Sequence, residues 1–528
     1  MKRVALGGRL RRLSAGVLAL VVAASTFVGV INSNPAAADA SELYSWGYNL
    51  SGQLGNGTTA NATAPSKVSL PTGVSATGAA AGSDHSMAIG SDGKVYAFGD
   101  NSNGQLGNGT TTGSATPVVV SMPSGVTAIK VAAGVLHSVA LGSDGNVYDW
   151  GYNGYGQLGN GSLVDSSTPI KVSLGTGVVV TSIAAGAYFT LALTSAGNVY
   201  GWGYGAQGTL CDGKVTNPQK TPAEATVSNI AALAAGGYHS LFLTNNSILY
   251  ACGYNAFGQL GNGTTTNHAT RVAVSMPSGV TATSIAAGQY HSLATGSNGK
   301  LYAWGENANG QLGNGTTTNS LTPAEVSMPS GVTATSINAG NTHSVAIGSD
   351  GNLYAWGYNG LGELGDGNTT EAHTPTEVSL PAVANPATIL ASGSSADHSL
   401  AVASPTPALT VTSLSASPNP AVYGQTVTLT ASLNRNDGGG SMAFKKGSTT
   451  ISGCGAVSLS LVGGTYKASC STVPSAGTYS LTAIYSGDSL YASSTSSAVS
   501  LMVSAAPLSI TASSGTMTYG GSVSSITA

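Results

Sequence analysis

The feature of this sequence that most restricts its fold is a passage that recurs seven times at a nearly constant spacing. Copies of the word YxWG follow one another at intervals of 52, 52, 52, 50, 52 and 52 residues. The words HS and GQLGNG, or close variants of them, accompany every copy. A period near 50 residues with strand-like segments predicts a β-propeller, because one small sheet buries both faces only when neighbouring repeats stack on it. The Trp position of the word is held by Trp46, Phe98, Trp150, Trp202, Cys252, Trp304 and Trp356.

The two ends of the repeat region indicate how the propeller closes. Residues 85–99, HSMAIGSDGKVYAFG, predict a hairpin of two apolar strands around a tight turn. The repeat region opens at 43–47 with a YxWG strand that lacks an HS strand before it. It ends at 397–403 with an HS strand that lacks a YxWG strand after it. Pairing these two half-hairpins would remove two exposed strand edges, so we predict a ring of seven blades over residues 41–404.

The composition favours an all-β chain throughout. The 528 residues include 74 glycines and only 7% charged residues, which suits short strands and tight turns better than helices. Residues 409–504 carry alternating strands that resemble a bacterial immunoglobulin-like repeat, a module that usually serves as a stalk. We therefore expect a seven-bladed β-propeller followed by an immunoglobulin-like β-sandwich. Residues 405–408 are expected to form a linker, and 505–528 the incomplete start of a further domain of a longer surface protein.

The first forty residues predict export. Basic residues lead into the apolar run 13–30, and NPAAADA then offers small-residue cleavage sites, the pattern of a signal peptide over 1–40. A retained membrane anchor is the alternative, because the apolar run approaches the length of a spanning helix. After cleavage the chain would carry 12 basic and 19 acidic residues, a net charge of about −7. We expect a secreted or cell-surface protein that binds no nucleic acid, and no membrane beyond its export signal.

Several of the repeated words resemble a known family. They are AAG at 286–288, HSLA at 291–294, LYAWG at 301–305 and GQLGNG at 310–315. These resemble the repeats of the regulator of chromosome condensation (RCC1-like) family over about residues 43–403. The resemblance implies a seven-bladed propeller whose loops bind other proteins. In architecture the chain also resembles the secreted beta-lactamase inhibitory protein II, which holds an enzyme with aromatic and acidic side chains of one face.

Residues present in every repeat are interpreted as scaffold, and function is expected where the repeats differ at one rim. Around each hairpin, the residue before HS should face the residue two after the Trp position, at the same end of the blade. Tyrosines fill these positions in several consecutive blades, which suits a contact surface, although they could instead cover blade edges. The predicted binding residues are Tyr152, Tyr155, Tyr188, Tyr204, Tyr238, Tyr254, Phe257, Tyr290, Glu306, Asp84 and Asp100.

No catalytic or metal site is expected. The repeated His is interpreted as a buried ring with a satisfied hydrogen bond. In DHS at 84–86 and 397–399, the His points away from the side shared by the Asp and the Ser, so no triad forms. Motifs for nucleophilic, zinc or phosphate chemistry are missing from the sequence, and the Asn-Gly loops hold too few carboxylates for calcium. We expect no cofactor and no enzyme.

The four cysteines fall into two pairs by position. Cys211 replaces a Gly of GQLGNG, and Cys252 replaces the Trp in the following repeat. We predict a disulfide between these blades, with two isolated thiols as the alternative. In the immunoglobulin-like segment, Cys454 and Cys470 are predicted to form a bridge within a hairpin.

Together these observations favour an exported, non-enzymatic propeller that binds a protein through a Tyr-rich rim and is carried on an immunoglobulin-like stalk. A glycan-binding or cell-wall adhesin is one alternative, and an inhibitor of a secreted enzyme is another. An enzyme with its site in the axial channel is the weakest interpretation, because convergent ionisable residues are missing.

Overall fold

The computed structural model describes residues 41–381, 387–403, 410–434, 439–487 and 491–507. The predicted signal peptide, the predicted linker and most of the predicted terminal fragment lie outside these residues. All regular structure in the described ranges is β-strand, which confirms the all-β prediction. These ranges contain no helix that could cross a bilayer.

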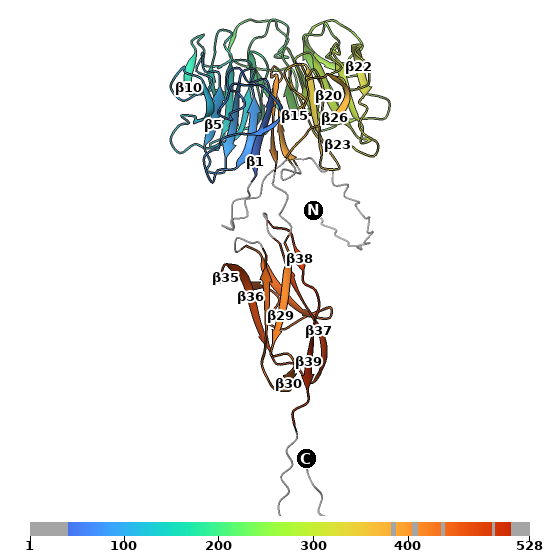
Figure 1. Ribbon diagram of the computed structural model, residues 1–528. Coiled ribbons are helices and arrows are strands. Elements are labelled where there is room, and N and C mark those ends of the chain that lie inside the picture. Colours follow the sequence, from blue (N-terminus) through green and yellow to red (C-terminus); the bar gives the residue numbers. More distant parts are fainter. Residues whose placement is uncertain (1–40, 382–386, 404–409, 435–438, 488–490, 508–528) are drawn as a thin grey trace, which may run out of the picture. The chain divides into compact units, whose positions relative to one another are not determined.

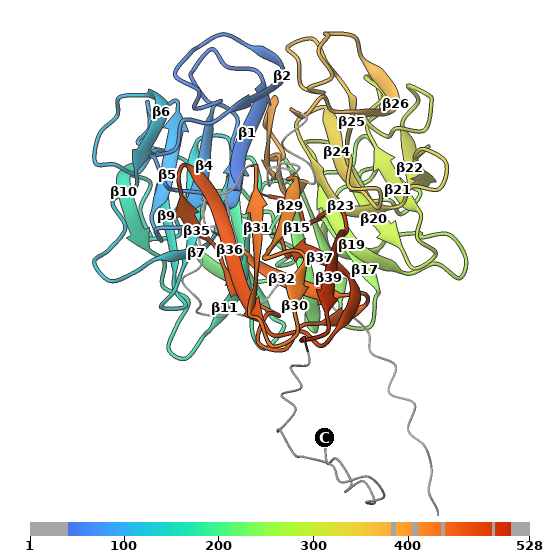
Figure 2. The ribbon, with the colours of Figure 1, turned by 60° about the horizontal axis from the view of Figure 1, so that its bottom comes forward.

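Seven four-stranded antiparallel sheets form the propeller (Figures 1 and 2). In each of blades 1 to 6, four consecutive strands pair in chain order. Blade 1 contains β3 (Ala76–Ala81), β4 (His85–Gly90), β5 (Val95–Gly99) and β6 (Ser114–Val119). Blade 2 contains β7 (Ala128–Ala133), β8 (His137–Gly142), β9 (Val147–Gly151) and β10 (Ser166–Lys171). Blade 3 contains β11 (Val180–Ala185), β12 (Phe189–Thr194), β13 (Val199–Gly203) and β14 (Gln219–Glu224).

Blades 4 to 6 repeat this order. Blade 4 contains β15 (Ile230–Ala235), β16 (His239–Thr244), β17 (Leu249–Gly253) and β18 (His268–Ala273). Blade 5 contains β19 (Ala282–Ala287), β20 (His291–Gly296), β21 (Leu301–Gly305) and β22 (Ser320–Glu325). Blade 6 contains β23 (Ala334–Ala339), β24 (His343–Gly348), β25 (Leu353–Gly357) and β26 (Ala372–Glu377).

Blade 7 closes the ring with strands from both ends of the repeat region. Its order is β2 (Ala62–Lys67), β1 (Glu42–Gly47), β28 (His398–Ala403) and β27 (Ala387–Ala391). β1 pairs antiparallel with β28 in continuous register, from Glu42 opposite Ala403 to Gly47 opposite His398. The predicted closure is therefore confirmed, and the two strand edges that an unclosed ring would expose are paired with each other.

The GQLGNG loops pack each blade against the next one. A Cβ atom at Gly107, whose φ is +63°, would lie 2.6 Å from Nε1 of Trp150 in the following blade, so only glycine fits here. The same Trp150 Nε1 donates a hydrogen bond of 2.9 Å to the Gln105 carbonyl oxygen. In six of the seven seams the loop thus covers the buried aromatic ring of the next blade, which explains why this word recurs.

The seam between blades 3 and 4 is built differently, and here the predicted disulfide is wrong. Cys211 and Cys252 are free, fully buried thiols. Cys252 Sγ lies 3.9 Å from the Thr209 carbonyl oxygen, and burial, followed by the neighbouring Cys211, raises the pKa of the Cys252 thiol. Cys211 stands at the glycine position with a φ of +58°, and Cys252 stands where the Trp ring would lie. The pair therefore fills the Gly–Trp contact with two non-covalently packed thiols.

The immunoglobulin-like segment folds as a two-sheet sandwich. One sheet has the order β29 (Thr412–Ser417), β31 (Val427–Leu433), β36 (Thr465–Thr472) and β35 (Ser460–Val462). The other has the order β30 (Ala421–Val422), β39 (Val499–Ser504), β37 (Gly477–Tyr485), β32 (Ser441–Lys446) and β33 (Thr449–Thr450). β34 (Val457–Ser458) pairs with β32, and β38 (Ser494–Thr495) pairs with β37.

The disulfide between Cys454 and Cys470 is confirmed. It does not bridge a hairpin, however. Cys454 lies between β33 and β34, beside β32, whereas Cys470 lies in β36 of the other sheet. The bond therefore links the two sheets beside their apolar core.

Candidate functional site

The predicted rim positions meet in pairs at one end of the blades. In each pair, the residue after the YxWG strand donates its backbone N–H to the carbonyl of the residue before the HS strand. These bonds measure 2.7 to 3.0 Å and run from Tyr48 to Asp397, Asp100 to Asp84, Tyr152 to Leu136, Tyr204 to Tyr188, Tyr254 to Tyr238, Glu306 to Tyr290 and Tyr358 to Thr342. The predicted pairing is confirmed, and it places side chains from all seven blades on the same rim.

All eight predicted aromatic residues belong to one continuous set of ring contacts, which we call the aromatic network. Tyr155 links blades 2 and 3, with ring centroids 5.2 Å from Tyr188 and 5.3 Å from Tyr204. Tyr238 stacks on Tyr290 at 5.8 Å with an interplanar angle of 14°. The members of the network are Tyr152, Tyr155, Tyr188, Tyr204, Tyr238, Tyr254, Phe257 and Tyr290.

The rings of the aromatic network are half-buried, unlike the core Trp residues, which are fully buried. Burial raises the pKa of Tyr238 to about 12, and it also raises the pKa values of Tyr188 and Tyr290. These three hydroxyls therefore stay protonated at neutral pH and can donate hydrogen bonds. A rigid aromatic surface with polar tips can bury apolar area at a small cost in side-chain entropy.

The three predicted acidic residues flank this network and are held by glutamine side chains of the GQLGNG loops. The Gln105 amide donates to Asp100 at 2.6 Å, and the Gln311 amide donates to Glu306 at 3.3 Å. The Gln53 amide points to Asp84 at 3.5 Å. Burial is the main cause that raises the pKa values of Asp84 and Glu306.

Sequence reasoning missed one residue of this rim, Glu363. It occupies the Gln position of the loop word, which reads GELGDG at 362–367. Glu363 is fully buried, and burial followed by repulsion from Asp397 raises its pKa to about 7. The available signal was the substitution itself, because a carboxylic acid replaces an amide at a position that is Gln in five other repeats.

The repeated His residues belong to the scaffold, as predicted. His85 Nε2 lies 2.9 Å from Ser138 Oγ of the next blade, and the closing bond joins His398 to Ser86 at 2.6 Å. Burial lowers the pKa of His85 to about 4 and that of His398 to about 3. Among the described residues, no three His, Cys, Asp or Glu side chains are arranged to hold a metal ion.

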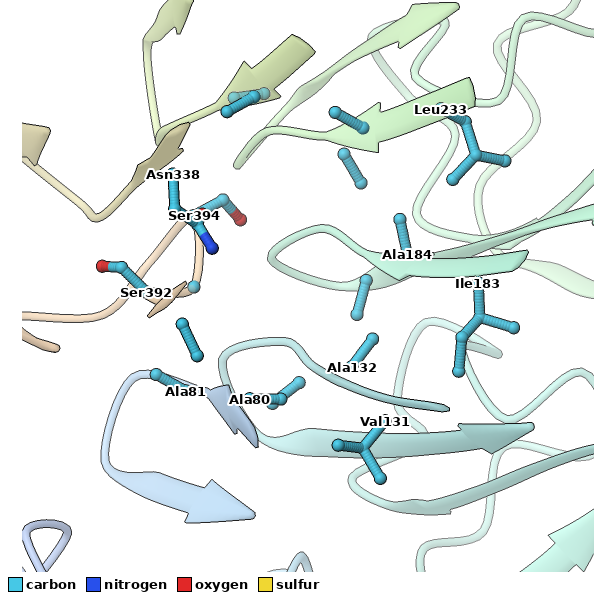
Figure 3. A pocket seen from close by; sticks show the side chains of 18 of the residues that line it. Ala80, Ala81, Val131, Ala132, Ile183, Ala184, Leu233, Asn338, Ser392 and Ser394 are labelled. Atoms are coloured by element: carbon cyan, nitrogen blue, oxygen red, sulfur yellow. The ribbon is translucent and has the colours of Figure 1, made fainter. Parts of the chain in front are cut away.

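The axial cavity of the propeller has a volume of about 240 Å³ and is lined mainly by Ala, Val, Ile and Leu (Figure 3). Its polar side chains, Asn338, Ser392 and Ser394, gather on one side. None of the lining residues is ionisable. Acid–base chemistry therefore has no side chain to use there.

Comparisons with known proteins agree with this architecture. Residues 42–401 match the RCC1-like domain, and residues 414–504 match the bacterial Ig-like domain (group 3). The chain is 30% identical over 338 residues to the ultraviolet-B receptor UVR8 of Arabidopsis thaliana, a match that covers 64% of this chain and 66% of the receptor. It is 29% identical over 339 residues to the human E3 ubiquitin-protein ligase HERC2, covering 63% of this chain but only 7% of the ligase.

Among solved structures, yeast RCC1 (Prp20) bound to Kap60 aligns with a TM-score of 0.63 and 24% identity, over 69% of this chain and 89% of that protein. Human WBSCR16 aligns with a TM-score of 0.62 and 23% identity, over 69% of this chain and 99% of that protein. These likenesses concern the fold. On the family match and the seven closed blades, this chain belongs to the RCC1-like domain family, with a bacterial Ig-like domain following the propeller.

Proposed function

We propose that the propeller is a non-enzymatic protein-binding module whose contact surface is the aromatic network, exported and carried on the Ig-like domain as a stalk. The observation that carries this proposal is the continuity of the network. Eight rings from blades 2 to 5 contact one another at the rim and remain half-buried. Rings that served only the core would be fully buried, as Trp150 and Trp304 are.

Ring contacts of this kind support binding because they fix the surface before a partner arrives. An edge-to-face or stacked pair contributes about 0.5–1.5 kcal/mol, and a held ring loses little further entropy on binding. The acidic residues beside the network would favour a partner with complementary charge. The yeast relative is described in complex with Kap60 and as binding Gsp1p and histones, so protein binding occurs on this fold.

The test is capture of partners from secreted and cell-wall extracts by the full chain. A variant with Ala at Tyr188, Tyr204, Tyr238 and Tyr254 removes the centre of the network. The matched control, Tyr200→Ala with Tyr250→Ala, removes rings near the opposite ends of β13 and β17.

We expect wild type and control to retain the same protein and the variant with four substitutions to lose it, with urea unfolding showing that all three are folded under the capture conditions. Equal capture by the variant with four substitutions would show that these tyrosines serve packing and not binding. Retention of cell-wall sugars in place of a protein would favour the adhesin alternative.

A further inference from the structure

The rim contains one place where the usual hydrogen-bond donor has been replaced by an acceptor. In blade 7, the loop glutamine Gln53 points its amide at Asp84, the residue before the next HS strand. Glu363 and Asp397 hold the corresponding positions at the seam between blades 6 and 7. Glu363 lies close enough to Asp397 for the charge of Asp397 to act on it, and we call these two residues the closure acidic pair.

The closure acidic pair is incomplete within the part of the chain that the structure describes. Glu363 Oε2 accepts a hydrogen bond of 2.9 Å from the Leu361 backbone, as the loop glutamines do from theirs. Glu363 Oε1 is buried and has no hydrogen-bond partner. Asp397 accepts from the Asn341 side chain, and an ionised Glu363 offers it no donor. A buried acceptor without a donor costs about 1–3 kcal/mol, and more when it is charged.

The surroundings of the closure acidic pair are acidic and aromatic. Burial, and after it repulsion from Asp84, raises the pKa of Asp397, and Tyr358 and Tyr48 both lie within range of its charge. The four ion pairs of the described chain lie elsewhere, at Lys67–Glu42, Lys94–Asp92, Lys300–Glu325 and His373–Glu371. No described Lys or Arg therefore forms an ion pair with these carboxyl groups.

We propose that the closure acidic pair is a subsite for a cationic side chain, most suitably the guanidinium group of an arginine on the protein partner. This inference rests on the proposed function, because it specifies the partner's chemistry at the same rim. A planar guanidinium presents several donors; it can contact the partly exposed Asp397 directly, and it reaches the fully buried Glu363 when the GELGDG loop moves aside. The neighbouring Tyr48 and Tyr358 rings can add cation–π attraction.

Binding of a cation here should release a proton. Glu363 lies near Asp397 and its pKa is raised to about 7, so at neutral pH the pair holds a proton in about half of the molecules. A guanidinium supplies both the positive charge and the missing donors, and the proton then leaves to solvent. The affinity for a cation should consequently rise with pH through about 7.

The experiment uses the full chain with ¹³C-labelled Asp and Glu carboxyl groups, titrated with the peptide acetyl-Gly-Arg-Gly-amide. The matched neutral probe carries citrulline in place of arginine. Glu363→Gln restores the residue of five other repeats, so this variant should fold. Asp366→Asn is the matched control, because it removes one negative charge from the same loop and also restores the usual residue.

We expect the arginine peptide to shift the Glu363 carboxyl resonance saturably and the citrulline peptide to leave it unchanged. Glu363→Gln should weaken binding about tenfold, followed through the Asp397 resonance, while Asp366→Asn binds as wild type. Three results would overturn the inference: no shift with arginine, equal shifts with both peptides, or saturable Ca²⁺ binding without an arginine effect.

The outcome is separable from that of the proposed function. The variant with four Tyr→Ala substitutions should still bind the arginine peptide if the subsite exists, even if it captures no protein. Loss of arginine binding with capture intact would reject the subsite alone.

Discussion

The seam between blades 3 and 4 provides the sharpest test of how this propeller is packed. Three residues there depart together from the repeat: Cys211 replaces Gly, Cys252 replaces Trp, and Phe242 replaces an Ala. All three are fully buried in one apolar cluster. Phe242 and Cys252 lie on the same face of neighbouring strands, because Cys252 pairs with Ser240. We infer that the Phe ring and the Cys211 side chain occupy the volume that a Trp fills elsewhere.

Restoring the Trp alone should therefore be destabilising. At the equivalent seam, a Cβ atom at Gly107 would approach the Trp150 ring to 2.6 Å, so a Trp at 252 would collide with Cys211. It would also compete with Phe242. Each overpacked contact costs about 1–3 kcal/mol, so Cys252→Trp should lower the free energy of unfolding by about 4 kcal/mol.

The compensating changes should recover most of that loss. Cys211→Gly removes both the collision and a left-handed backbone strain of about 1 kcal/mol, and Phe242→Ala makes room for the ring. Phe242→Ala alone should cost about 3–5 kcal/mol through the cavity that it leaves. The triple variant should come within about 1 kcal/mol of wild type, measured by urea unfolding of all variants in one cycle. A neutral Cys252→Trp, or a triple variant no more stable than the single one, would refute the packing argument.

Three further predictions concern buried titratable groups. The pKa of Glu363 is raised from 4.5 to about 7, so the free energy of unfolding falls as pH rises from about 4.5 to 7. Denaturant titrations at each pH should find Glu363→Gln about 3 kcal/mol more stable than wild type at pH 8 and equal to it near pH 4. The pKa of His343 is lowered to about 4, so native stability falls as pH drops below 6.5, and His343→Gln should reduce the acid-side slope by about 1.4 kcal/mol per pH unit; an unchanged slope would contradict this. Asp149 is fully buried, accepts a hydrogen bond of 2.8 Å from Trp202 Nε1, and has its pKa raised by burial. Asp149→Asn should keep that hydrogen bond and unfold at a higher temperature than wild type at pH 7, with no gain at pH 3.

The sequence predicted the ring closely because its information is periodic. The half-hairpins at 43–47 and 397–403 each lacked a partner strand, which predicted that they pair with each other. The rim pairs were predicted because two residues at equal distances in sequence from a hairpin turn, such as the one at Asp92, lie opposite each other. Periodicity says little about departures from the period. Whether Cys211 and Cys252 form a bond or only touch depends on ångström-scale placement at a strained backbone position. The partner sheet of Cys470 likewise depends on sandwich topology, which spacing alone does not determine.

Two of the departures from the repeat differ in physical kind, and the difference between them bears on function. Cys211, Phe242 and Cys252 compensate one another within a closed core, so selection for packing is sufficient to explain them. Glu363 has no such compensation among the described residues, since its exchange of a donor for an acceptor leaves a buried oxygen without a partner. Glutamine at this position does not satisfy every buried atom either, since Nε2 of Gln157 and of Gln259 is also buried without a partner, but glutamine carries no charge. What remains without compensation is the acidity of Glu363 beside Asp397, and the cationic subsite proposed above would offset it.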